Sequence, residues 1–249
     1  MFKNLIKRLL ATKGFELRRV IAPEAAELPD HQLYRPLYSP WLGTGEFQRY
    51  FEIAAPRTLV SKDRCYVLHT LLRQALHVDG DVWQCGVFKG GTAAMMAAIL
   101  NDFCPTKRLS LFDTFEGMPE TDAQRDWHKK GDFSDTSVEA VTSFVKNHGA
   151  CIIRQGFIPE TFAGLESARI AFAHIDVDIY KSIIDCLEFI WPRVSVGGFV
   201  VFDDYGFPTC PGARAAVDEF FSKTEFFPLC LATGQAVVFK GNSDQSGLH

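Results

Sequence analysis

Four aspartates stand in two short clusters, each after an apolar run of the chain. Asp176 and Asp178 follow the run at 170–173, and Asp203 and Asp204 follow the run at 198–202. Such apolar runs are typical of buried parallel strands, whose carboxyl ends meet at one edge of a sheet, where open α/β folds bind ligands. Carboxylates brought together there must share a cation, share protons or repel one another. A hard divalent metal is the simplest explanation, so the pattern predicts a metal site.

Each aspartate pair taken alone also has a structural explanation. Asp203 and Asp204 can cap a turn or a helix, and Asp176 and Asp178 can be solvated loop acids. Two pairs at the ends of neighbouring strands favour the metal. His174 lies on the apolar strand itself, where a lone histidine is more often a core residue than a ligand.

A glycine-rich turn lies between the first predicted core strand and the helix after it. It contains Gly86, Gly90 and Gly91. Glycine lets a ligand approach the backbone, and a helix N-terminus offers free N–H groups. The full GxGxxG pattern is absent, so an ordinary tight turn explains this segment about as well. Asp113 follows the second predicted strand, where an acid can accept both hydroxyls of a ribose or, alternatively, cap a turn.

Alternating strands and helices from residue 61 predict an α/β fold with a doubly wound, mostly parallel sheet. A late pair of apolar segments predicts an antiparallel hairpin at the carboxyl end. The expected helices are 61–76, 92–100, 137–146, 182–191 and 213–221, and the expected strands are 82–87, 108–113, 151–153, 170–175, 198–202, 226–231 and 236–239.

Three segments are expected along the chain. Residues 1–60 read as a basic helix followed by a proline-rich arm or lid, residues 61–240 as the main domain, and residues 241–249 as a polar tail. The basic amphipathic stretch at 1–20 favours a helix packed on the domain or on a second subunit. The alternative is a helix that lies weakly on an anionic membrane surface.

The composition excludes several classes of protein. A net charge of −4 and a pI near 6.0 argue against a nucleic-acid binder. Seven scattered cysteines without a CxxC spacing argue against a disulfide framework and favour a reducing, cytoplasmic location. No apolar stretch is long enough to form a membrane span.

Several motifs together resemble the macrocin O-methyltransferase (TylF-type) family. In order along the chain they are GDVWQCGVFKGGTA, LFDTFEGMPE, DFSDTSVEAV, the segment from HIDVDIY to VVFDDYG, and CPGARAAVDEFF. The resemblance covers roughly residues 60–240 and is specific, because the motifs agree in order and spacing. It implies a Rossmann-like class I fold that uses S-adenosylmethionine and Mg²⁺ to methylate hydroxyls, often on sugars of natural products.

The resemblance also implies roles for individual residues. Asp178 matches the position proposed as the general base, and Asp176 belongs to the catalytic centre as well as to the metal site. The implied metal ligands are Asp176, Asp203 and Asp204. The implied cofactor-binding residues are Gln84, Gly86, Gly90, Gly91, Thr92 and Asp113. Gln84 departs from the glutamate usual in the family, so we expect a weaker contact with the cationic end of the cofactor.

The function expected from the sequence is a Mg²⁺-dependent O-methyltransferase acting on a sugar hydroxyl of a small-molecule glycoside or a cell-surface saccharide. The physics is consistent, since a divalent cation lowers the pKa of a bound hydroxyl and a nearby carboxylate can remove its proton. A homo-oligomer is expected, without nucleic acid. Two alternatives stay open: a metal-dependent hydrolase, and a non-catalytic S-adenosylmethionine-binding or scaffold protein.

Overall fold

A computed structural model of the chain describes residues 38–242. The basic segment at 1–20, most of the proline-rich arm and all but the first two residues of the polar tail lie outside the described residues. Their expected roles therefore stay predictions.

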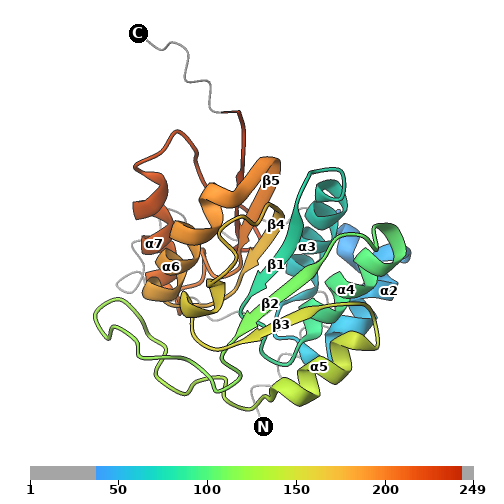
Figure 1. The fold of residues 1–249 in the computed structure, drawn as a ribbon, viewed down its shortest axis with the longest axis horizontal. Coiled ribbons are helices and arrows are strands. Elements are labelled where there is room, and N and C mark those ends of the chain that lie inside the picture. Colours follow the sequence, from blue (N-terminus) through green and yellow to red (C-terminus); the bar gives the residue numbers. More distant parts are fainter. Residues whose placement is uncertain (1–37, 243–249) are drawn as a thin grey trace, which may run out of the picture. The chain divides into compact units, whose positions relative to one another are not determined.

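The core of the fold is a seven-stranded sheet in the order β3-β2-β1-β4-β5-β7-β6 (Figure 1). Strands β1 to β5 run parallel, whereas β7 is antiparallel to β5 and pairs with the short β6. The predicted mostly parallel sheet with an antiparallel carboxyl-terminal pair is confirmed. The strands are β1 (Asp81–Cys85), β2 (Leu109–Asp113), β3 (Ile152–Gln155), β4 (Ile170–Ile175), β5 (Val194–Phe202), β6 (Leu229–Cys230) and β7 (Ala236–Phe239).

Helices cover both faces of the sheet (Figure 1). On one face pack α2 (Glu46–Ala54), α3 (Lys62–Ala75), α4 (Gly91–Phe103) and α5 (Val138–Lys146), and on the other α6 (Tyr180–Ile190) and α7 (Pro211–Phe221). Successive strand residues face opposite sides, so Val82 joins the first apolar core and Trp83 the second. Strands buried on both faces must be apolar throughout, which explains the continuous apolar runs in the sequence.

Four short 3-10 helices complete the described elements: η2 (Pro40–Leu42), η3 (Ala55–Arg57), η4 (Glu160–Phe162) and η5 (Trp191–Arg193). Some predicted boundaries differ by a few residues. The largest difference is in β5, which begins at Val194 instead of Gly198.

Residues 46–57 differ from the sequence-based expectation of an irregular arm. They form α2 and η3, and Phe47, Tyr50 and Ala54 are buried in the same apolar core as α3 and α4. The apolar residues do have helical spacing, but the helix has only a few turns and lies between prolines at 40 and 56. So short a pattern between two prolines was interpreted as an irregular segment. These residues belong to the packed unit that begins at Ser39.

The order of the strands positions the site. The chain leaves β1 toward β2 and β3 and then returns on the other side of β1 to form β4 and β5. At this reversal the loops after β1 and β4 separate and leave a crevice. The Asp176 N–H still donates to the Cys85 carbonyl at 2.9 Å, so the first aspartate cluster begins at the crevice.

Candidate functional site

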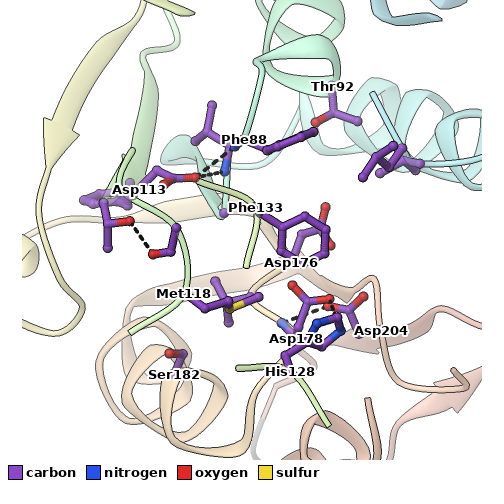
Figure 2. Close-up of a pocket in the computed structure, with 18 of the residues that line it drawn as sticks. Phe88, Thr92, Asp113, Met118, His128, Phe133, Asp176, Asp178, Ser182 and Asp204 are labelled. Carbon is purple, nitrogen blue, oxygen red and sulfur yellow. Dashed lines mark hydrogen bonds and ion pairs between the residues drawn. The ribbon is translucent and has the colours of Figure 1, made fainter. Parts of the chain in front are cut away.

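A cavity of about 280 Å³ lies at the carboxyl ends of the central strands. Its walls come from the loops after β1, β2, β4 and β5, from the first turn of α4, and from the long loop 114–137 (Figure 2). Asp113 lies on one side of the cavity, and Asp176, Asp178 and Asp204 gather on another. The structure thus brings the glycine turn and three of the four clustered aspartates to one cavity, whereas Asp203 is buried behind it and does not line it.

The two aspartate pairs meet because β4 and β5 are neighbours. The Asp203 N–H donates to the Ile175 carbonyl at 2.9 Å, and the Asp178 N–H donates to Asp204 Oδ2 at 3.1 Å. One possible ligand atom each from His174, Asp176 and Asp203 lies within 4.8 Å of the others. These contacts join both clusters into one carboxylate group.

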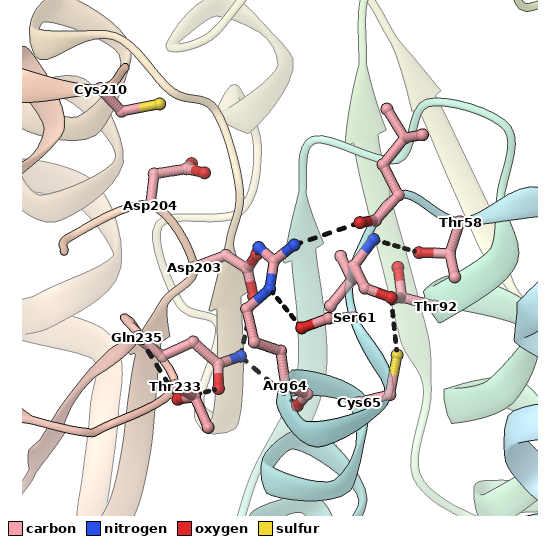
Figure 3. Close-up of polar contacts among 12 residues, drawn as sticks. Thr58, Ser61, Arg64, Cys65, Thr92, Asp203, Asp204, Cys210, Thr233 and Gln235 are labelled. Carbon is pink, nitrogen blue, oxygen red and sulfur yellow. Dashed lines mark hydrogen bonds and ion pairs between the residues drawn. The ribbon is translucent and has the colours of Figure 1, made fainter. Parts of the chain in front are cut away.

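Asp203 is the one carboxylate of this group whose charge is balanced by protein donors. Its side chain is fully buried, pairs with the Arg64 guanidinium and accepts from Gln235 Nε2 at 2.8 Å (Figure 3). It also lies 3.4 Å from His174 Nε2. Burial by itself raises the pKa of Asp203, but these three neighbours outweigh it and hold the pKa below its ordinary value. Asp203 therefore stays ionised, and His174 is a buried partner of that carboxylate.

Asp176 and Asp204 have no such balance. Burial first, and then the charges of the neighbouring aspartates, raise the pKa of both carboxyls well above the ordinary value. Within residues 38–242, no lysine, arginine or histidine forms an ion pair with either side chain. Neighbouring carboxylates that form no direct ion pair with a basic side chain suit a hard divalent cation such as Mg²⁺. The donor set therefore fits the metal implied by the sequence.

The Arg64–Asp203 pair leads to a stability prediction. Arg64→Gln leaves a fully buried carboxylate without its cation, so we expect the metal-free protein to lose about 3 kcal/mol of unfolding free energy. Urea unfolding followed by circular dichroism measures the change. The control is Arg73→Gln on the same helix, whose pair with Glu46 is half-exposed and contributes about 1 kcal/mol or less. Equal losses in the two variants would refute the assignment.

Asp178 occupies a special backbone position. Its backbone φ is +56°, a left-handed conformation that residues other than glycine, asparagine and aspartate rarely adopt. Oδ1 lies 3.7 Å from His128 Nε2 and 3.5 Å from Cys210 Sγ. Burial raises the pKa of the Asp178 carboxyl, and the nearby His128 offsets this only in part. A carboxylate with a raised pKa at the edge of the cavity is suited to accept a proton.

His128 and Cys210 are site residues that the sequence reasoning did not find. Both line the cavity beside Asp178. No local signal marked them, because the loop around 128 and the turn before α7 come together only through packing.

The glycines of the turn are explained by close backbone contacts. A Cβ on Gly86 would lie 1.8 Å from the Asp176 carbonyl oxygen, and one on Gly91 would lie 2.6 Å from the Ala54 carbonyl oxygen. Gly90 precedes α4 in the left-handed region at φ +84°. Packing thus requires small residues here, and it also brings the N-terminus of α4 to the cavity, where Gly91 and Thr92 form part of the wall.

Asp113 holds the loops around the cavity. Its Oδ2 accepts from the N–H groups of Val87 at 2.6 Å and Phe88 at 2.9 Å, and its Oδ1 accepts from the Phe115 N–H at 2.7 Å. The alternative role as a turn cap is therefore present in the structure. Each oxygen can accept further bonds, so a contact with ribose hydroxyls stays a prediction.

Gln84 lies behind the cavity wall and is 1% exposed. Its Nε2 donates to the Gly86 carbonyl at 2.9 Å and to Thr92 Oγ1 at 2.8 Å. Its Oε1 is buried and has no hydrogen-bond partner among residues 38–242. Gln84 supports two residues of the wall, so its expected contact with the cofactor stays a prediction.

Comparison with known proteins shows the family to which the chain belongs. The family model described as Macrocin-O-methyltransferase (TylF) matches residues 53–237. Over 167 residues the chain is 32% identical to 8-demethyl-8-(2,3-dimethoxy-alpha-L-rhamnosyl)-tetracenomycin-C 4'-O-methyltransferase of Streptomyces olivaceus, with 62% of each protein covered. It is 32% identical over 159 residues to demethyldecarbamoylnovobiocin O-methyltransferase of Streptomyces niveus, with 59% of this chain and 60% of that protein covered.

The aligned part spans about three fifths of the length of these two relatives. Among solved structures, the O-methyltransferase NovP matches with a TM-score of 0.67 and 24% identity, covering 75% of this chain and 83% of that one. This likeness confirms the fold.

Proposed function

Because the chain belongs to the macrocin O-methyltransferase (TylF) family, we propose that it transfers a methyl group from S-adenosylmethionine to a sugar hydroxyl, with Mg²⁺ at the aspartate cluster. One observation carries the proposal. The unbalanced carboxylates of Asp176 and Asp204 line the same cavity as the glycine turn and the N-terminus of α4. This arrangement supplies a metal site and a cofactor site side by side.

The proposed acceptor is a glycoside of small size. The name of the Streptomyces olivaceus relative describes a dimethoxy-rhamnosyl group on tetracenomycin C and O-methylation at a 4' position. A cell-surface saccharide is the other acceptor class consistent with a sugar hydroxyl. The acceptor would enter beside Asp178 and His128, where the cavity is lined by loop residues.

The residues of this chain have distinct tasks in the proposed reaction. Asp176, Asp203 and Asp204 would hold Mg²⁺, which as a Lewis acid lowers the pKa of the sugar hydroxyl. Asp178 would accept the hydroxyl proton on its carboxylate while the oxygen forms a bond to the methyl carbon and the carbon–sulfur bond breaks. Gly86, Thr92 and Asp113 would orient the cofactor so that donor and acceptor align.

The loop 114–137 would cover the reacting groups. Met118, His128 and Phe133 from this loop line the cavity, whereas Trp127 points outward and is 61% exposed. Exclusion of water favours transfer to the sugar over hydrolysis of the reactive donor.

Location and assembly are also proposals. All seven cysteines are free, which agrees with the reducing cytoplasm proposed from the sequence. Between residues 38 and 242, no helix has the length and apolar character needed to cross a bilayer. A homo-oligomer stays a prediction.

Binding of the demethylated cofactor tests the proposed function against its two rivals. We expect S-adenosylhomocysteine to give a saturable calorimetric signal with the full chain, and labelled S-adenosylmethionine to transfer its methyl group to a member of a glycoside panel. Metal-dependent hydrolysis without cofactor binding would support the hydrolase and reject the proposal. Cofactor binding without transfer to any glycoside or saccharide would support the non-catalytic reading.

A further inference from the structure

We propose that His128, Asp178 and Cys210 form a second, softer metal site that binds Zn²⁺ and is distinct from the carboxylate group of Asp176, Asp203 and Asp204. One nitrogen, one oxygen and one sulfur of these residues lie within 4.8 Å of one another. Zinc is the metal that proteins bind with such mixed ligands, whereas Mg²⁺ prefers oxygen alone. The proposal does not depend on the proposed methyl transfer.

The distances between the three atoms match tetrahedral coordination. Asp178 Oδ1 lies 3.5 Å from Cys210 Sγ and 3.7 Å from His128 Nε2, and the sulfur lies 3.7 Å from the same nitrogen. Ordinary zinc–ligand bond lengths place tetrahedral ligand atoms roughly 3.3–3.6 Å apart. Movements of a few tenths of an ångström would close the site around the ion and leave a fourth position open.

Neighbouring groups orient the ligands as they do in zinc sites. Asp132 Oδ2 lies 3.3 Å from His128 Nδ1, and Thr209 Oγ1 lies 3.6 Å from Cys210 Sγ. A carboxylate that accepts from Nδ1 leaves the lone pair of Nε2 free to bind a metal. When His128 carries its proton on Nδ1, the lone pair of Nε2 faces the lone pairs of Asp178 Oδ1 beside the Cys210 thiol. A cation bound between these atoms would relieve their repulsion.

The backbone holds the ligands in place. Asp126 Oδ1 accepts the Tyr180 N–H at 2.9 Å and so attaches the His128 loop to the N-terminus of α6. Cys210 is 3% exposed and directly precedes α7, which packs against α6. Three segments distant in sequence thus meet beside the N-termini of two packed helices, which makes the site preorganised.

The charge around the site favours a cation. Asp178 places a carboxylate oxygen 3.5 Å from the Cys210 sulfur, and its negative charge attracts a cation. When zinc binds, the sulfur–hydrogen bond is exchanged for a sulfur–zinc bond and the proton passes to solvent. Zinc here would also occupy the Asp178 carboxylate and withdraw it from proton transfer.

Cobalt is a suitable probe because Co²⁺ takes the same ligands as Zn²⁺ and absorbs visible light. We expect the metal-free full chain to bind Co²⁺ with a thiolate-to-metal charge-transfer band and with the d–d bands of tetrahedral cobalt. Added Zn²⁺ should displace the cobalt at one equivalent, and a large excess of Mg²⁺ should not. Absence of the charge-transfer band in the wild-type protein would overturn the proposal.

Variants identify the ligands. Cys210→Ser should abolish the charge-transfer band, and Cys210→Ser and His128→Gln should each lower the Zn²⁺ affinity about 100-fold or more, with a loss of about 10-fold in Asp132→Asn. The matched control Cys230→Ser removes an exposed thiol and should keep the band. Asp176→Asn should keep it too, because that residue belongs to the other site. Unchanged zinc binding in folded His128→Gln, or a band that persists in Cys210→Ser, would refute the site.

Discussion

Replacement of Asp178 by asparagine is expected to lower kcat for methyl transfer by about 10²-fold or more, because the amide cannot accept the hydroxyl proton. The substitution isolates the charge, since asparagine tolerates the left-handed backbone that this position adopts at φ +56°. Single-turnover transfer of a labelled methyl group measures the rate. Calorimetry with S-adenosylhomocysteine should show unchanged cofactor affinity.

The control for this variant is Asp135→Asn. Asp135 pairs with Lys89 on the surface and has an exposed side chain, so its loss should leave the rate within about two-fold of the wild type. A normal rate in Asp178→Asn would reject the role of Asp178 as the proton acceptor. Equal losses in both variants would point to a general effect of charge removal.

Removal of the divalent metal should have an effect at least as large. A Lewis acid that stabilises the developing oxyanion contributes several kcal/mol, so we expect EDTA to slow transfer by about 10³-fold or more and Mg²⁺ to restore it. Asp176→Ala should resist this restoration because it removes one of the three proposed ligands. Transfer that continues in EDTA would overturn the metal role.

Thermal unfolding measures Mg²⁺ binding without any catalytic step, so it separates metal binding from methyl transfer. Mg²⁺ should raise the thermal unfolding midpoint of the wild-type protein, since a ligand that binds only the folded state stabilises it. The same addition should have little effect on Asp176→Ala. The control Asp185→Ala removes a carboxylate that pairs with Lys181 on α6, and it should keep the magnesium response. A full magnesium response in Asp176→Ala would reject its assignment as a ligand.

Much of the fold follows from local pattern. The short, mostly apolar runs at 82–85, 170–175 and 198–202 form strands of the parallel sheet, whose residues are buried on both faces. Residues 46–54 show the limit of such reasoning. Their helix gains its stability from burial of Phe47 and Tyr50 against other helices, which a short window of sequence does not reveal.

Some residues of the candidate site could likewise be predicted from the sequence, and others could not. The four aspartates were found because they follow recognisable strands, and strand ends converge by a general rule of α/β topology. Arg64, His128 and Cys210 were not found, since each lies on an element whose distance from the cluster depends on how helices and loops pack. Arg64 in particular shapes the electrostatics, because it pairs directly with Asp203, whereas Asp176 and Asp204 form no ion pair with any residue between 38 and 242.

The amino-acid order alone thus established the class of fold and the place where carboxylates would gather, because both depend on periodicity and on the ends of strands. Which carboxylate is already neutralised, and which nitrogen and sulfur stand beside Asp178, depended on the folded arrangement. The physical reason is that charge balance and metal coordination act over a few ångströms, between groups that the chain separates by tens of residues.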